Sequence, residues 1–175
     1  MTTLIYGKEI LILGCGNTLF GNDGFGPRVI QFLNENYSFP DYVLSLDAGT
    51  GIRDYIFDLL LMEDKPKQIF VIDAVSVPGR KTGELFEMSL DDVPKEKLSD
   101  FSLHQSPSSN LLSELNELGV DIRVYCVHTD SVPNFIDPGL SNKVERAIPK
   151  ACDWIIHQVD HQRTQRINDN LNINH

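Results

Sequence analysis

The sequence lacks the features that would place a protein in a membrane or send it out of the cell. No apolar run approaches the ~20 residues that a membrane-spanning helix needs. Residues 1–9 contain no cationic segment followed by an apolar stretch, which is the pattern of a secretory signal. We therefore expect a cytoplasmic protein that has no membrane partner.

Cysteine and positive charge are also scarce. The three cysteines, Cys15, Cys126 and Cys152, are far apart and form no Cys-x-x-Cys pair, so we expect small buried thiols rather than a disulfide framework. Lys and Arg number 15 against 25 Asp and Glu, which gives a formal net charge of −10. Because binding phosphates requires clustered Lys and Arg, we expect no nucleic-acid partner.

Short apolar runs alternate with amphipathic stretches along the 175 residues, which are enough for one substantial core. This pattern predicts an α/β protein, a three-layer α/β/α sandwich with a mainly parallel, twisted sheet of about five strands. A single domain is expected at residues 1–161, with a polar, frayed tail at 162–175. The expected strands are residues 9–15, 42–47, 68–75, 83–89 and 121–128, and the expected helices begin near residue 27 and cover 52–62, 106–118 and 141–161, the last with a kink at Pro149.

The most informative stretch is residues 10–28, in which a buried strand leads into a glycine-rich loop and then a helix. A dinucleotide-binding loop would need Gly or Ala at the position of Leu19. The loop also contains an acid, Asp23, and a carboxylate repels phosphate but attracts a cation. The stretch therefore indicates a site for a metal or a polar substrate, unless it is only a tight turn between strand and helix.

Two later strands also end in acids, Asp47 and Asp73, at the edge where open parallel sheets bind their ligands. His104 lies on a connection just before a predicted helix. Two carboxylates and an imidazole, from Asp23, Asp73 and His104, suit a divalent transition metal such as nickel or zinc, with positions left open for water or substrate. Each residue taken alone also fits a local role, as turn former, cap or backbone partner.

Residues 14–28, Gly-Cys-Gly-Asn-Thr-Leu-Phe-Gly-Asn-Asp-Gly-Phe-Gly-Pro-Arg, resemble the N-terminal signature of the hydrogenase maturation endopeptidases. Later blocks of that family are matched in the same order by Asp-Ala-Gly-Thr-Gly at 47–51, Ile-Asp-Ala at 72–74, Ser-Leu-His-Gln at 102–105 and the helical stretch at 140–149. The resemblance covers about residues 9–157. The subgroup that serves the deazaflavin (coenzyme F420)-reducing hydrogenases is the most similar in pattern.

The resemblance implies an aspartyl-type or metal-assisted endopeptidase that removes a C-terminal extension from the large-subunit precursor of a [NiFe] hydrogenase. Nickel, supplied by the substrate, is then the recognition element, and the enzyme holds no permanent metal. The family's metal-binding acid, acid and histidine match Asp23, Asp73 and His104. A further family acid matches Asp47, to which we assign a supporting catalytic role. Several members have Glu at the position of Asp23 and Asp at that of Asn22, so this chain has a shorter ligand and one charge fewer.

Two other functions fit the same residues. A non-catalytic nickel checkpoint or carrier protein would use the same three ligands, and only cleavage of the precursor distinguishes it from the endopeptidase. A peptidyl-tRNA-hydrolase-like enzyme would share the fold and the Gly-x-Gly-Asn sequence at 14–17, but the net charge of −10 disfavours a tRNA substrate.

Overall fold

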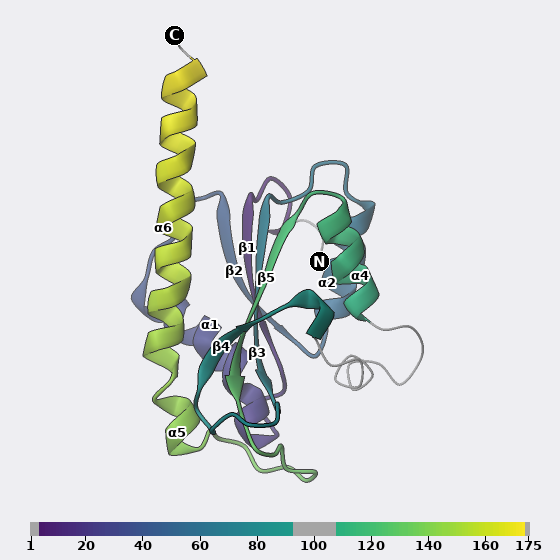
Figure 1. Ribbon diagram of the computed structural model, residues 1–175, viewed down its shortest axis with the longest axis vertical. Coiled ribbons are helices and arrows are strands. Elements are labelled where there is room, and N and C mark those ends of the chain that lie inside the picture. The colour runs from purple at the N-terminus through teal and green to yellow at the C-terminus, as the bar shows by residue number, and fades with distance from the viewer. Residues whose placement is uncertain (1–3, 93–107, 174–175) are drawn as a thin grey trace.

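A computed structural model describes residues 4–92 and 108–173 of the chain, which form a five-stranded sheet in the order β2-β1-β3-β5-β4 (Figure 1). The strands are β1 (Ile10–Cys15), β2 (Val43–Gly49), β3 (Gln68–Val75), β4 (Leu85–Met88) and β5 (Asp121–His128). The first three and β5 run parallel, and β4 pairs antiparallel with β5 at the edge. The predicted mainly parallel sheet is confirmed.

Helices cover both faces of this sheet (Figure 1). The helical elements are η2 (Gly21–Gly24), α1 (Phe25–Asn36), α2 (Ile52–Leu61), η3 (Leu90–Asp92), α4 (Ser108–Glu117), α5 (Asn142–Glu145) and α6 (Ile148–Ile173). Helices α1 and α6 pack on one face, and α2 and α4 pack on the other. The three-layer α/β/α sandwich predicted from the sequence is therefore confirmed.

The side chains of the central strands alternate between two hydrophobic cores. Leu11 and Leu13 of β1 face α2 and α4, whereas Ile10 and Ile12 face α1 and α6. Every residue of β3 is buried, because a central parallel strand is covered by helices on both faces. Each large apolar side chain buried in this way contributes about 1.5–3 kcal/mol.

The last helix differs from the prediction at both ends. The chain does not kink at Pro149: it breaks after α5, and Pro149 lies in the first turn of α6, where its missing N–H needs no partner. Residues 162–173, predicted as a frayed tail, are helical and project beyond the sheet (Figure 1). The packed half of α6, which includes Ile155 and Val159, supplies the helix nucleus, and extending an existing helix requires no second nucleus.

Hydrophobicity along α6 does not reach what a membrane span requires. Of the helices in residues 4–92 and 108–173, none is both long enough and apolar enough to cross a membrane.

Candidate active site

The glycine loop allows α1 to lie directly on the ends of β1 and β3. A Cβ atom on Gly26 would lie 2.3 Å from Cys15 O and 2.4 Å from Ile72 O, which is too close for any side chain. Gly16 has a φ of +123°, and a Cβ there would lie 1.8 Å from Asp23 O. Glycine is therefore required at both positions. The tight packing holds residues 16–24, which we call the acid loop because they contain Asp23, against the carboxyl edge of the sheet.

Asp23 lies in η2, next to this edge. Its Oδ2 accepts a hydrogen bond of 2.7 Å from the backbone N–H of Asn17, so the loop folds around the carboxylate. The side chain is half-buried. Because η2 contacts β3, the loop that carries Asp23 lies against the strand that carries Asp73.

Asp73 lies near the end of β3 and is only 9% exposed. Its Oδ1 accepts a hydrogen bond of 2.7 Å from the N–H of Ala74. Its register partner on β5, Cys126, belongs to the core beneath α2 and α4, so Asp73 faces that side of the sheet. Asp73 is thus a buried carboxylate that accepts a hydrogen bond, at the edge where open parallel sheets bind their ligands, and this placement makes it a candidate for a functional residue.

Asp47 lies apart from Asp73, although both end parallel strands at the same edge. Asp47 pairs in register with Gly14, at which a Cβ would collide with Ile30 of α1, so Asp47 faces the α1 side of the sheet. Because β1 lies between the two strands, their backbones are roughly 9–10 Å apart. Asp47 is exposed, and its Oδ1 accepts a hydrogen bond of 2.9 Å from the N–H of Gly49, as in an Asx turn.

The third predicted ligand, His104, lies outside the described residues, as do Ser106 and Pro107 at the predicted helix start. In residues 4–92 and 108–173, no three His, Cys, Asp or Glu side chains form a group that could hold a metal ion. The described chain resumes at Ser108, the first residue of α4, and α4 packs on the same face of the sheet as Asp73.

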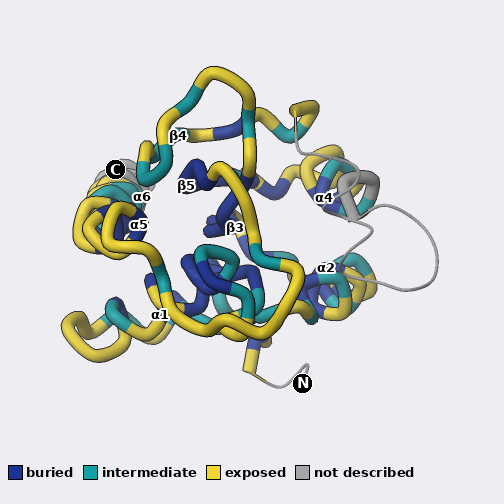
Figure 2. The backbone as a smooth tube through the Cα atoms, turned by 90° about the horizontal axis from the view of Figure 1, so that it is seen from below, coloured by how far each residue is buried: buried dark blue, intermediate teal, exposed yellow. Residues whose placement is uncertain are grey.

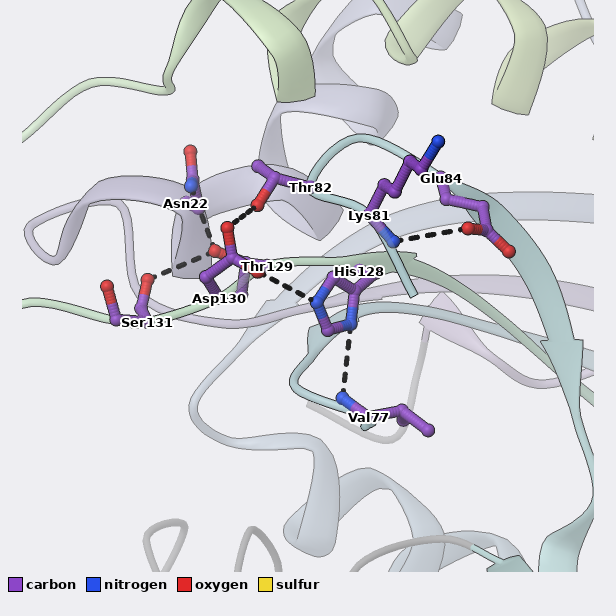
Figure 3. Close-up of polar contacts among 9 residues, drawn as sticks. All are labelled: Asn22, Val77, Lys81, Thr82, Glu84, His128, Thr129, Asp130 and Ser131. Atoms are coloured by element: carbon purple, nitrogen blue, oxygen red, sulfur yellow. Dashed lines mark hydrogen bonds and ion pairs between the residues drawn. The ribbon is translucent and has the colours of Figure 1, made fainter. Parts of the chain in front are cut away.

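Asn22, the neighbour of Asp23, connects the acid loop to the segment that follows β5 (Figure 3). Its Nδ2 donates a hydrogen bond of 2.9 Å to Thr129 Oγ1, and its Oδ1 accepts one of 2.8 Å from the N–H of Ser141. Thr129 is buried and donates in turn to Ser131 O over 3.0 Å. From the sequence alone, Asn22 stands out only because several family members have Asp at this position. Its hydrogen bonds could not be predicted, because the two partners lie 107 and 119 residues further along the chain.

His128 at the end of β5 connects the loops that follow β3 and β5 (Figure 3). Its Nδ1 accepts a hydrogen bond of 3.1 Å from the N–H of Val77, so the ring proton is assigned to Nε2, which donates to Asp130 Oδ1 over 3.2 Å. The Thr82 hydroxyl donates to the other oxygen of Asp130. The hydrogen bond from Thr82, followed by that from His128, lowers the pKa of Asp130.

A small cavity opens between the acid loop and the segment that enters α5. Its volume is about 250 Å³. The cavity is lined by Thr18, Gly21, Gly24, Arg28, Gly139, Leu140 and Glu145. Pockets for drug-sized ligands have volumes of about 300–1,000 Å³, so this one is suited to a single side chain rather than to a nucleotide.

The chain is similar to known proteins over most of its length. The sequence pattern described as hydrogenase maturation protease matches residues 27–158. A putative hydrogenase maturation protease of Methanocaldococcus jannaschii is 35% identical over 153 residues, which are 87% of this chain and 97% of that protein. The coenzyme F420 hydrogenase subunit delta of Methanothermobacter thermautotrophicus is 35% identical over 158 residues, which are 88% of this chain and 96% of that protein.

The fold is also similar to the crystal structure of a [NiFe] hydrogenase maturation protease, HycI, from Thermococcus kodakarensis. The TM-score is 0.67 at 24% identity, over 91% of this chain and 97% of that chain. The structural similarity supports the fold, and the sequence matches extend over most of the chain and of both relatives. The chain therefore belongs to the hydrogenase maturation protease family and is an enzyme of that kind, a peptide-bond hydrolase.

Proposed function

We propose that the chain removes a C-terminal extension from the nickel-loaded large-subunit precursor of a [NiFe] hydrogenase. Membership of the family supports proteolysis in hydrogenase maturation. The observation that carries the finer proposal is the placement of Asp23 and Asp73 on touching elements, η2 and β3, at the carboxyl edge of the sheet. The relative named coenzyme F420 hydrogenase subunit delta supports a deazaflavin-reducing hydrogenase as the source of the precursor.

Nickel is part of the substrate in this proposal. Asp23 and Asp73 supply carboxylate oxygens, and His104, included on the sequence resemblance alone, supplies an imidazole nitrogen, a donor set that suits nickel. Nickel is a Lewis acid that polarises a scissile carbonyl or a bound water. Asp47 is assigned to orienting substrate or water, in addition to forming its turn. Cleavage then depends on nickel, because a precursor without the metal lacks the group that the two acids bind.

Mass spectrometry of the precursor, incubated with this protein with and without nickel, tests the proposal. We expect loss of a C-terminal peptide from the nickel-loaded precursor only. If the mass is unchanged in both samples but a stable complex forms with the nickel-loaded precursor, the protein acts on this precursor as a nickel checkpoint and not as its protease. Cleavage that proceeds equally well without nickel would show that the metal is not the recognition element.

Substitution of Asp73 tests its role in this reaction. Asp73→Asn keeps the shape of the side chain but removes the charge that binds a cation, so we expect processing to be abolished while the fold is retained. The matched control is Asp64→Asn, because Asp64 is exposed in the turn before β3, at the opposite edge of the sheet. Unimpaired processing by Asp73→Asn would remove this residue from the mechanism.

A further inference from the structure

Large apolar side chains are exposed at the carboxyl edge of the sheet, next to the acid loop that contains Asp23. The segment after β5 runs across this edge and is exposed along most of its length (Figure 2). It carries Val132, Phe135 and Ile136, which are 38%, 64% and 68% exposed, and Leu19 of the acid loop is 47% exposed. We call these four residues the apolar patch. Leu19 and the stretch at 132–136 lie on segments joined by backbone hydrogen bonds, and a concentration of exposed apolar side chains of this kind marks a surface that binds a partner.

The backbone beneath the apolar patch is held in place. The N–H of Gly21 donates to Asp137 O over 2.8 Å, and the N–H of Asp137 donates to Leu19 O over 2.9 Å. Phe20 and Asp137 thereby form a parallel β-bridge. A Cβ on Gly21 would lie 3.0 Å from Cδ of Pro133, so the two segments are also closely packed. The patch is therefore a preformed surface, and a partner that binds it need not first order these segments.

The apolar patch is continuous with the acid loop. The N–H of Asp23 donates to Phe20 O over 3.1 Å, and Phe20 is the residue bridged to Asp137. One backbone unit thus carries both the proposed metal-binding carboxylate and the patch. A polypeptide whose metal centre reaches Asp23 comes to lie beside Leu19 and the segment that carries Phe135.

We propose that the large-subunit precursor docks on the apolar patch through an apolar segment that adjoins its nickel site. This inference rests on the proposed function and adds the surface by which the substrate is recognised. Two exposed acids, Asp130 and Asp137, flank the patch, so they favour a precursor segment that is neutral or basic around its apolar residues. A second copy of this chain is a poor occupant, because each copy carries a net charge of −10.

Kinetics of precursor cleavage by Phe135→Ser and Ile136→Ser test the docking surface. We expect the KM for the nickel-loaded precursor to rise roughly tenfold to a hundredfold in each variant, as for loss of a large buried apolar side chain. We expect kcat to stay unchanged, because neither residue is among the proposed metal ligands. The matched control is Phe57→Ser on the outer side of α2, where Phe57 is 53% exposed. Thermal unfolding of all three variants checks that each is folded.

The outcomes separate this inference from the function on which it rests. An unchanged KM in Phe135→Ser, or the same increase in Phe57→Ser, overturns the docking surface. If the wild-type protein cleaves nothing, the proposed function fails, but native mass spectrometry still tests docking: the precursor should bind wild-type protein and Phe57→Ser, and not Phe135→Ser. If the wild-type protein is a dimer and Phe135→Ser is a monomer, the patch binds a second copy and the inference is wrong.

Discussion

The side-chain amide of Asn22 donates a hydrogen bond of 2.9 Å to the hydroxyl of Thr129, which lies 107 residues further along the chain. This contact fastens η2, the element that carries Asp23, to the end of β5 (Figure 3). The carbonyl of the same amide binds the N–H of Ser141 and so holds the chain just before α5. The position of the acid is therefore set by long-range contacts as well as by its own loop.

Asn22→Ala should weaken both the fold and the activity, because it removes two hydrogen bonds, one of them part-buried, that fasten η2 to the segment after β5. We expect a loss of about 1–3 kcal/mol in the free energy of unfolding, measured in urea, together with slower precursor cleavage. Asn22→Asp should lose less stability, since it keeps an acceptor for the N–H of Ser141. Wild-type stability in Asn22→Ala would show that the bridge contributes nothing.

His128 should stabilise the folded protein through the hydrogen bond that its Nδ1 accepts from the N–H of Val77. His128→Leu leaves this N–H without its acceptor, and we expect a cost of about 1–3 kcal/mol in unfolding free energy. His128→Asn places an amide oxygen near the position of Nδ1 and should recover part of that loss. Equal stability of the Leu and Asn variants in denaturant would contradict the assigned role.

Gly26→Ala should prevent correct folding, because its methyl group would lie 2.3 Å from Cys15 O and 2.4 Å from Ile72 O. The helix α1 would have to move off the sheet, so we expect little soluble protein or a large fall in melting temperature. Gly51→Ala is the control, since a Cβ there meets nothing closer than 3.4 Å. A Gly26→Ala protein that melts like the control would disprove the close approach.

The ion pair between Arg123 and Glu87 should make stability depend on pH. Arg123 donates two hydrogen bonds to Glu87, Nε to Oε1 over 2.6 Å and Nη2 to Oε2 over 2.7 Å, and they lower the pKa of Glu87. A lowered folded-state pKa stabilises the protein above the unfolded pKa, and this stabilisation is lost as the pH falls through the folded pKa.

Glu87→Gln should therefore be less stable than the wild-type protein at pH 7 by roughly 0.2–1 kcal/mol, as for partly exposed ion pairs. The difference should narrow as the pH falls below 4.5, the ordinary pKa of a glutamate. Urea unfolding at several pH values measures the difference in unfolding free energy between the two proteins. The control is Glu63→Gln, because Glu63 lies in an exposed turn. A difference that persists in acid would assign the effect to packing and not to charge.

The three cysteines should be unreactive in the folded protein, because all are buried. Burial raises the pKa of Cys152 to about 12, so only about one thiol in ten thousand is ionised at pH 8. We expect no modification of Cys152 by iodoacetamide in native buffer and complete modification in urea, as read by mass spectrometry. Rapid labelling of the native protein would show that the core around α6 opens readily.

The architecture was predictable from the sequence because the central strands are buried on both faces and form continuous apolar runs. The predicted strands at 68–75 and 121–128 match β3 and β5 at both ends. Prediction failed where the deciding contact was distant. For example, the packing of the first half of α6 against α1 and the sheet supports a helix that continues through residues read as a polar tail.

The sequence by itself determined the layers, the glycine loop and the carboxylates at the strand ends, because hydrophobic periodicity, turn residues and strand direction are local properties. Only the tertiary structure decided which side chains meet. It put Asp47 and Asp73 on opposite faces of the sheet, joined Asn22 to Thr129, and left Phe135 exposed beside the loop of Asp23. These relationships depend on how loops distant in sequence cross one edge of the sheet, and no pattern of neighbouring residues encodes that crossing.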